Sequence, residues 1–160
     1  MAYVPIVPYA DLEFADGYFG ERLGSEAWDV LDNNTKAKAL KHATKYIDTL
    51  PFIGTKTDTT LDEDKRPNQP REFPREGYTE IPDEVMEATC EAALAILNGD
   101  TLENLQTQAE VTSTSTGDAS SSFDTTNRKI DINDGLISAM VLRLLHEWLI
   151  DPNVVRLERV

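Results

Sequence analysis

Residues 81–97 read IPDEVMEATCEAALAIL, and apolar residues fill so many of these positions that they cover most sides of a helix. Pro82 stands at or near the first helical turn, where its missing amide hydrogen has no cost. Gly99 follows as a terminator after Asn98. The stretch therefore predicts a helix that is apolar on most sides and has one polar face, formed by Glu84, Glu87 and Glu91.

Two helices are predicted before this one. Asp11 is a good N-cap for a short helix that ends near Gly24, and Ser25 can cap a further turn, EAWDVL. Asn34 or Thr35 can begin a longer helix that runs to about residue 50, where a proline follows. The side of this helix opposite its apolar face carries a basic stripe: Lys38, Lys41 and Lys45.

A last helix is predicted to run to Ile150 from an N-cap at Asn133 or Asp134. Three other segments have no helical period. Residues 51–80 form a long loop whose polar middle indicates mobility, residues 107–126 are rich in Ser and Thr and favour an exposed hairpin, and residues 151–160 form a tail with strand-like alternation. The fold class is therefore mainly α: a single domain of residues 1–160, with a small bundle of four to five helices, a long irregular loop and a small β-hairpin or extended element.

Composition limits the function. Fifteen Lys and Arg against 29 Asp and Glu give a net charge of −14, which disfavours tight binding to phosphate backbones. The single cysteine, Cys90, excludes an intramolecular disulfide and is expected to be a small buried apolar residue. The N-terminal residues have no basic region of a signal peptide, and the most apolar stretch, LISAMVLRLLHEWLI, is too short and too often interrupted by charge to span a bilayer.

Catalytic and metal-binding patterns are incomplete. His146 begins an HE sequence like that of zinc-protease helices, but position 150 is Ile where the second histidine is required. The other histidine, His42, is expected to be solvated or at the edge of the core. Asp131 opens a calcium-loop-like DINDG that lacks the later bidentate Glu, and no nucleophile elbow or phosphate loop occurs. We expect no enzyme activity, no cofactor and no metal site.

The charge distribution allows two interpretations. The lysine stripe (Lys38, Lys41 and Lys45) and the face formed by Glu84, Glu87 and Glu91 can be two solvated surfaces. Alternatively, they can meet between copies of the chain, since a head-to-tail contact that closes gives a ring and complementary charges fix its register.

The order of several motifs resembles the head–tail adaptor (connector) proteins of tailed bacteriophages. These motifs are the early helix with Tyr18, Phe19 and Arg22, then Trp28, the LPFIGTKTD turn at residues 50–58, and FPR at residues 73–75 shortly before IP. The resemblance covers residues 9–99 and extends to the rest of the chain only by the arrangement of its segments.

The resemblance implies a structural virion protein that is made in the host cytoplasm and located at the head–tail junction. A ring of about twelve copies would bind the portal, extend the channel through which genomic DNA passes without sequence-specific binding, and offer a surface to the tail or stopper protein. It also implies a portal-binding role for the C-terminal residues Val154, Val155, Arg156, Leu157, Glu158, Arg159 and Val160. Within residues 51–80, Phe52 and Phe73 would anchor the ends of the loop, while Arg71 and Arg75 would face a neighbour or the portal.

The same type of protein is sometimes labelled DnaT-like, which gives the alternative: an acidic accessory of DNA replication or a module that binds single-stranded DNA. The charge of −14 and the lack of interleaved aromatic and basic residues argue against that activity.

Overall fold

The computed structural model describes residues 5–63, 67–99 and 138–150. The described residues form a mainly helical bundle with α1 (Leu12–Glu21), α2 (Glu26–Asp29), α3 (Asn33–Ile47), α4 (Asp83–Leu97) and α6 (Ala139–Leu145). No β-strand occurs among these residues, which contain only isolated antiparallel bridges. The predicted fold class is confirmed. The Ser/Thr-rich segment and the C-terminal tail of the prediction lie outside the described residues.

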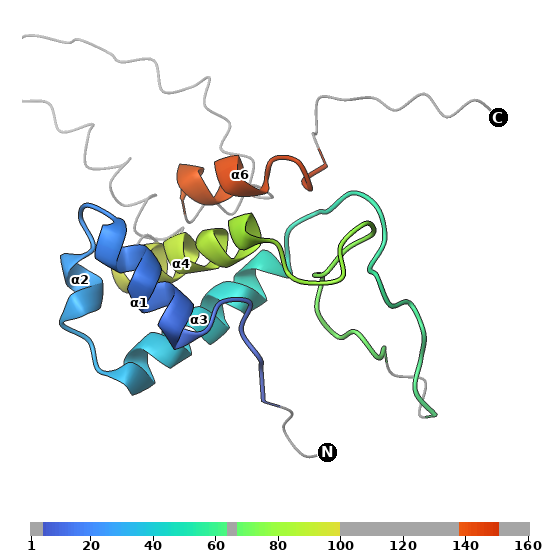
Figure 1. The fold of residues 1–160 in the computed structure, drawn as a ribbon, viewed down its shortest axis with the longest axis horizontal. Helices are drawn as coiled ribbons and strands as arrows, with labels where there is room; N and C mark the ends of the chain where they lie inside the picture. Colours follow the sequence, from blue (N-terminus) through green and yellow to red (C-terminus); the bar gives the residue numbers. More distant parts are fainter. Residues whose placement is uncertain (1–4, 64–66, 100–137, 151–160) are drawn as a thin grey trace, which may run out of the picture.

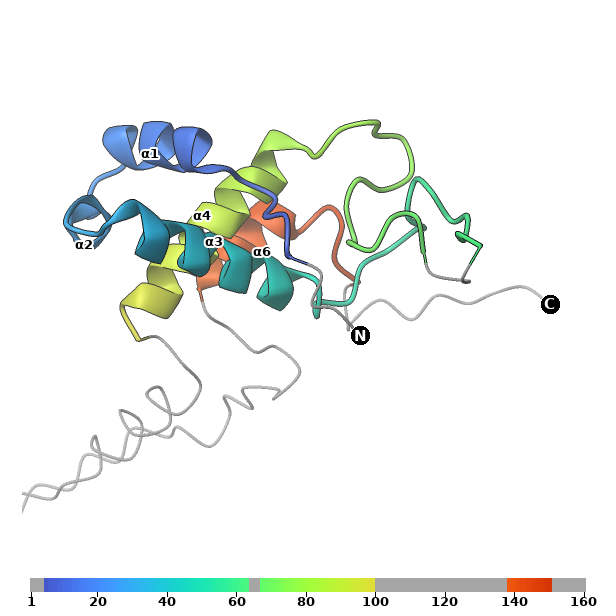
Figure 2. The same cartoon turned by 90° about the horizontal axis from the view of Figure 1, so that it is seen from below.

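Helix α4 is the centre of the bundle. It contacts α1, α2, α3 and α6, and it lies between α6 on one side and α1 and α3 on the other (Figures 1 and 2). The residues that let neighbouring helices approach it are small, and they are completely or almost completely buried: Ala88, Thr89, Cys90, Ala92 and Ala93. The Thr89 hydroxyl donates to the carbonyl of Val85 at 2.8 Å, so its burial leaves no polar atom unpaired. The apolar character seen in the sequence thus corresponds to a helix enclosed on most sides.

The predicted helix boundaries are partly confirmed. Asp11 caps α1, since its carboxylate accepts a hydrogen bond from the Phe14 amide at 2.8 Å. Gly99 follows α4 with a φ of 76°, the left-handed conformation that suits glycine at a helix end. The start of α3 was predicted two or three residues too late, at Asn34 or Thr35, because Asp32 is the N-cap and accepts hydrogen bonds from both the amide and the hydroxyl of Thr35.

The ends of α3 and α6 also differ from the prediction, for one shared reason. Helix α3 ends at Ile47 and not near residue 50, and α6 ends at Leu145 and not at residue 150. The segment that follows α3 forms backbone hydrogen bonds with the segment that follows α6. Ile53 donates its amide hydrogen to the carbonyl of Trp148 at 2.8 Å, and Ile150 donates to the carbonyl of Pro51 at 3.0 Å. Within the described residues, α6 begins after Ser138, whose hydroxyl accepts from the Met140 amide, and the predicted caps at 133 and 134 lie outside them.

The loop of residues 51–80 lies at the end of the bundle away from α2 (Figure 1). Its two predicted anchors are confirmed, since Phe73 is buried, and Phe52 packs half-buried against it with ring centroids 4.9 Å apart. Phe73 also contacts the rings of Tyr9 and Trp148, each at 5.8 Å. A single phenyl ring therefore joins the N-terminal segment, the loop and the chain after α6.

Replacing Phe73 with alanine should lower the free energy of unfolding by about 3–5 kcal/mol, because it removes a buried ring that no other side chain can replace. Urea denaturation followed by circular dichroism measures this change. Tyr78→Ala is the matched control, since Tyr78 lies in the same loop but is 44% exposed, and it should cost much less. A loss below about 1 kcal/mol for Phe73→Ala would contradict the anchoring role.

Candidate functional site

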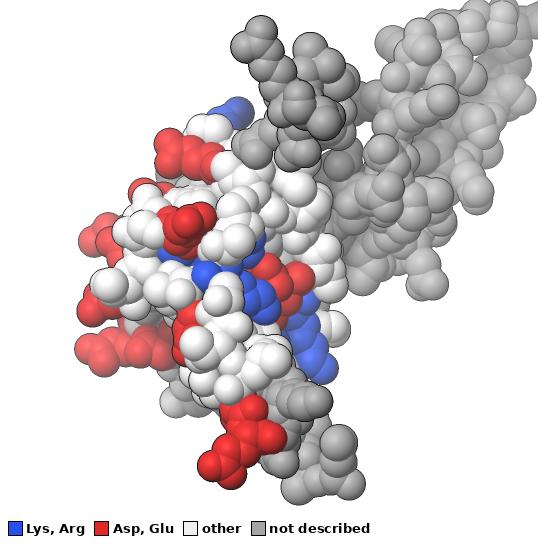
Figure 3. Space-filling model, turned by 90° about the vertical axis from the view of Figure 1, so that its right-hand side faces the viewer, with Lys and Arg blue, Asp and Glu red and all other residues white. Residues whose placement is uncertain are grey.

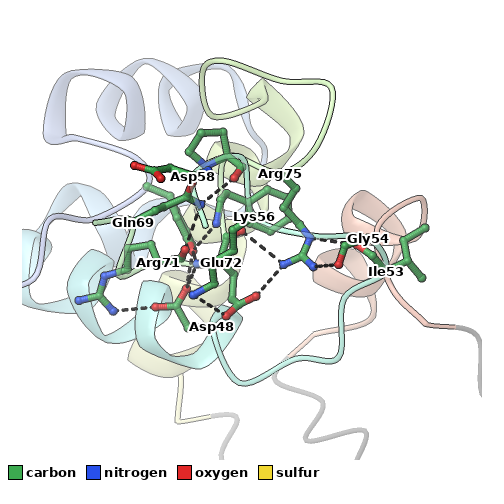
Figure 4. A network of polar contacts seen from close by, with 12 residues as sticks. Asp48, Ile53, Gly54, Lys56, Asp58, Gln69, Arg71, Glu72 and Arg75 are labelled. Atoms are coloured by element: carbon green, nitrogen blue, oxygen red, sulfur yellow. Dashed lines mark hydrogen bonds and ion pairs between the residues drawn. The ribbon is translucent and has the colours of Figure 1, made fainter. Parts of the chain in front are cut away.

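The strongest concentration of polar contacts lies where the loop meets the bundle (Figure 4). We call the first part of it the tyrosine clasp, formed by Tyr9, Asp48, Arg71, Glu72 and Phe73. The Tyr9 hydroxyl donates to Asp48 and accepts the amide hydrogens of Glu72 and Phe73, at 3.0 and 3.2 Å. Arg71 closes the group from the other side, with its guanidinium 2.6 Å from the Asp48 carboxylate. One hydroxyl thus connects the N-terminal segment, the end of α3 and the loop.

Burial and the carboxylate of Asp48 raise the pKa of the Tyr9 hydroxyl well above its ordinary value. The hydroxyl therefore keeps its hydrogen at all physiological pH values and always donates to Asp48. The clasp does not change protonation at Tyr9 under these conditions.

The second part is centred on Arg75, which is buried. Its guanidinium donates to the carbonyls of Ile53 at 3.0 Å and Gly54 at 2.6 Å, and binds the carboxylate of Glu72 at 2.6 Å. It also lies over the Phe52 ring, 5.5 Å from the centroid. The prediction that Arg75 faces a neighbour or the portal is wrong, because all these groups lie within the chain. An arginine fork bound to two carbonyls and a carboxylate holds the two sides of the loop together.

The polar middle of the loop is also ordered by specific contacts. The Gln69 side chain donates to the carbonyl of Pro74 at 2.7 Å and accepts the amide hydrogen of Asp58 at 3.0 Å. Thr57 donates its amide hydrogen to the carbonyl of Pro74, and Glu76 donates to the carbonyl of Thr55. The described residues of the loop are irregular, as predicted, but they are held together rather than extended freely into solvent.

A third group of contacts lies at the opposite end of the bundle, around Glu91. This residue was predicted to belong to an exposed acidic face, but it is only 3% exposed and binds within the chain. The Arg22 guanidinium binds it with two nitrogens, one of them 2.9 Å from Oε2, and the Tyr18 hydroxyl donates to it at 2.7 Å. The interpretation of Glu91 as part of a contact between copies is therefore corrected, since a carboxylate so enclosed has no surface to offer.

The other two glutamates of that face differ from each other. Glu84 is exposed in the first turn of α4, where the helix dipole favours a negative charge. Glu87 is half-buried, and its pKa is raised first by this burial and then by the negative charges of Glu84, Asp83 and Glu91. The positions of Glu84 and Glu87 are therefore explained by their own helix, without a contact to a second copy of the chain.

The lysine stripe lies where it was predicted, on the outer side of α3, with Lys38 and Lys45 exposed and Lys41 half-buried. None of the three forms a salt bridge with a described residue. Five other described cations are bound to carboxylates, in the pairs Arg22–Glu91, Lys36–Asp16, Lys56–Glu72, Arg71–Asp48 and Arg75–Glu72, whereas Arg143 on α6 is exposed and forms no salt bridge with a described residue. On the face that includes the loop, basic atoms accordingly lie among acidic ones and do not form a continuous basic surface (Figure 3).

The described residues offer no obvious reactive group. They contain no cluster of three or more His, Cys, Asp or Glu side chains that could hold a metal ion. Cys90 is buried, as predicted, and burial together with the charge of Glu91 raises its thiol pKa to about 12. His42 and His146 are exposed. Among the described helices, none is long and apolar enough to cross a membrane.

Comparison of the sequence with known protein families identifies one that matches it. The family described as "Putative DnaT-like ssDNA binding protein" matches residues 8–159, which is nearly the whole chain. The chain belongs to this DnaT-like family. No curated protein and no solved structure matches it. The family match includes all the described helices and the loop of residues 51–80, and the DnaT-like label expected from the order of the motifs is confirmed.

Sequence reasoning missed the most connected residues of this site. Tyr9 and Asp48 carry no local signal, because their partners in the clasp are 23 to 64 residues away along the chain, and Glu72 contacts both of them from the loop. Glu91 did carry one, since apolar residues flank it on both sides and a charge in such a run is a candidate for a buried ion pair. The predicted portal-binding residues, 154–160, lie outside the described residues.

Replacing Tyr9 with phenylalanine should lower the free energy of unfolding by about 1–3 kcal/mol, because the buried amide of Phe73 loses its acceptor and the amide of Glu72 keeps only the longer bond to Asp48, at 3.3 Å. Urea denaturation measures it. Tyr78→Phe is the control, because no hydrogen bond of the Tyr78 hydroxyl occurs within the described residues. Equal stability of Tyr9→Phe and the unaltered chain would show that the clasp contributes nothing.

Replacing Glu87 with glutamine should raise stability at pH 7. The raised pKa means that the folded state holds the proton more tightly than the unfolded state, so ionisation at neutral pH costs stability that glutamine does not lose. The difference in stability between Glu87→Gln and the unaltered chain should shrink as the pH falls through the raised pKa of Glu87. It should vanish below the ordinary glutamate pKa of about 4.3. Thermal melts at pH 7 and pH 3.5 test it, with Glu84→Gln as a control that should not stabilise. A destabilised Glu87→Gln at pH 7 would refute this explanation.

Proposed function

We propose that this DnaT-like protein is a non-enzymatic structural component of a tailed bacteriophage, a head–tail adaptor that forms a ring of about twelve copies beneath the portal. The observation that carries the proposal is the described part of the loop, residues 51–63 and 67–80, which the tyrosine clasp and Arg75 hold against the end of the bundle. Preorganisation of this kind lowers the entropy cost of docking, so it suits a surface that binds another protein. The order of the motifs in residues 9–99 supports the same conclusion.

In this proposal, the loop and the C-terminal residues 154–160 bind the portal, and the remaining surface meets neighbouring copies and the tail or stopper protein. The protein is then located at the head–tail junction after synthesis in the host cytoplasm. Genomic DNA passes through the ring without being held, because an acidic wall repels phosphate and allows sliding. Arg71 remains a candidate contact of the loop, since its side chain is only partly buried.

The second candidate is a protein that binds single-stranded DNA, and the family description favours it directly. Its best support in the structure is the lysine stripe on α3, the only group of described Lys residues without carboxylate partners. Binding of single strands usually combines such a basic track with aromatic rings on which bases stack. Tyr78 is the only large aromatic side chain exposed among the described residues, and it lies in the loop. We therefore place this function second.

One pair of measurements separates the two candidates. The purified chain is mixed with the portal protein of the same phage, and the mass of the complex is measured by light scattering after gel filtration. We expect co-elution at about one copy per portal subunit. In parallel, fluorescence anisotropy with a labelled oligothymidine at about 150 mM salt should detect no binding below about 100 μM.

The opposite results in these two measurements would place the single-stranded-DNA-binding function before the adaptor function. A chain that ignores the portal and binds the oligonucleotide at low micromolar concentration would overturn the adaptor proposal. Loss of that binding in a Lys38→Glu, Lys41→Glu, Lys45→Glu variant would then assign it to the lysine stripe.

A further inference from the structure

The turn between α1 and α3 exposes two large apolar side chains. Leu23 is 95% exposed and Val30 is 83% exposed, more than any other large hydrophobic residue in the described part of the chain. They lie on either side of α2, and Ala27, one turn before Val30, is exposed as well. We call residues 21–32 the α2 corner. Single exposed apolar residues are common, but two at this level in one short segment indicate a surface that something covers.

The α2 corner is rigidly built. The Ser25 hydroxyl is within hydrogen-bond distance of the carbonyls of Phe19 at 2.9 Å and Arg22 at 3.1 Å. Trp28 is buried, and its indole nitrogen donates to Asp16 at 2.8 Å. Gly24 has a φ of 77°, which turns the chain between the two helices. Because the backbone is fixed by buried groups, Leu23 and Val30 cannot turn inward, and their exposure is a property of the folded corner.

The exposed charged residues of the corner are all acidic. Glu21, Glu26, Asp29 and Asp32 are exposed. Arg22 is the one cation of the corner, and its guanidinium binds Glu91. The corner therefore presents apolar side chains surrounded by carboxylates. The lysine stripe of α3 is its chemical complement on the same molecule, since its ammonium groups have no salt-bridge partner among the described residues and its long aliphatic stems can cover apolar atoms.

We propose that the α2 corner of one copy packs against the lysine stripe of a second copy. The inference rests on the proposed ring, because a head-to-tail contact requires two different, complementary surfaces on each copy. It replaces the pairing of the stripe with the glutamates of α4, since Glu91 is enclosed within its own chain. The apolar pair supplies the buried centre of the contact, and the carboxylates and ammonium groups at its rim fix the register.

Cysteine cross-linking tests the contact between named positions. Cys90 is fully buried and has a raised pKa, so an introduced thiol is the reactive one in the native chain. A Leu23→Cys chain and a Lys41→Cys chain are mixed and treated with a short bismaleimide, both as concentrated free protein and in the presence of the portal protein. We expect a cross-linked dimer in the mixture and none above background from either chain alone. The control is Leu23→Cys mixed with Met140→Cys, which places a thiol on α6.

Charge reversal provides a second, independent readout. A Glu26→Lys, Asp29→Lys chain and a Lys41→Glu, Lys45→Glu chain should each lose self-association, because like charges then meet at the contact. Their mixture should associate again, because the reversed corner of one complements the reversed stripe of the other. Circular dichroism of each variant verifies that the fold is retained, which is expected because all four positions are outside the buried core.

The outcomes separate this inference from the proposed function. Wild-type chain that joins the portal, together with cross-linking no greater than in the Met140→Cys control, would overturn the α2 corner contact and leave the adaptor function intact. Wild-type chain that ignores the portal but gives the Leu23→Cys to Lys41→Cys product when concentrated would retain the contact and refute the adaptor function. Reversal variants that associate as well as wild type would also overturn the contact.

Discussion

The enclosure of α4 is the constraint on which the rest of the fold depends. A helix with apolar residues on most sides gains stability only if other elements cover it, and α1, α2, α3 and α6 do so. The small residues of α4 let these helices approach closely, and its one deeply buried charge, Glu91, is retained because Arg22 and Tyr18 satisfy it. The composition of α4 therefore requires helices on either side of it, and the two surfaces proposed to bind other proteins lie at the ends of this bundle.

At the end of the bundle away from α2, the described residues of the 51–80 loop have no regular secondary structure but are held in place by specific contacts. A loop of this length ordinarily has few internal partners. Here carbonyl and amide groups of the loop form hydrogen bonds with the side chains of Tyr9, Gln69 and Arg75. At the other end, the α2 corner is fixed in a similar way by Ser25 and Trp28, and it holds apolar side chains outward. Both ends thus have buried polar contacts that support an exposed surface, an arrangement that suits the proposed binding of other proteins.

The sequence predicted the helices well, because their signals are local. Period, caps and terminators placed α1, α3 and α4 to within three residues, and Phe52 and Phe73 were recognised as anchors of the loop. The contacts of the loop could not be predicted, since the partners of Tyr9 and the carbonyl partners of Arg75 are distant in sequence and are brought together only by the fold. The same reason explains the error at Glu91, whose helical spacing with Glu84 and Glu87 suggested one exposed face, while packing against α1 buries it.

The described residues of the loop, 51–63 and 67–80, are a fixed part of the fold and not a flexible connection. Native-state hydrogen exchange of the free chain, read by NMR at single amides, tests it most directly. We expect the amides of Ile53, Thr57 and Glu76, each bonded to a carbonyl, to exchange slowly, with protection approaching that of α3 and α4. Exchange of these three amides at the rate of an unfolded chain, while α3 and α4 remain protected, would contradict it.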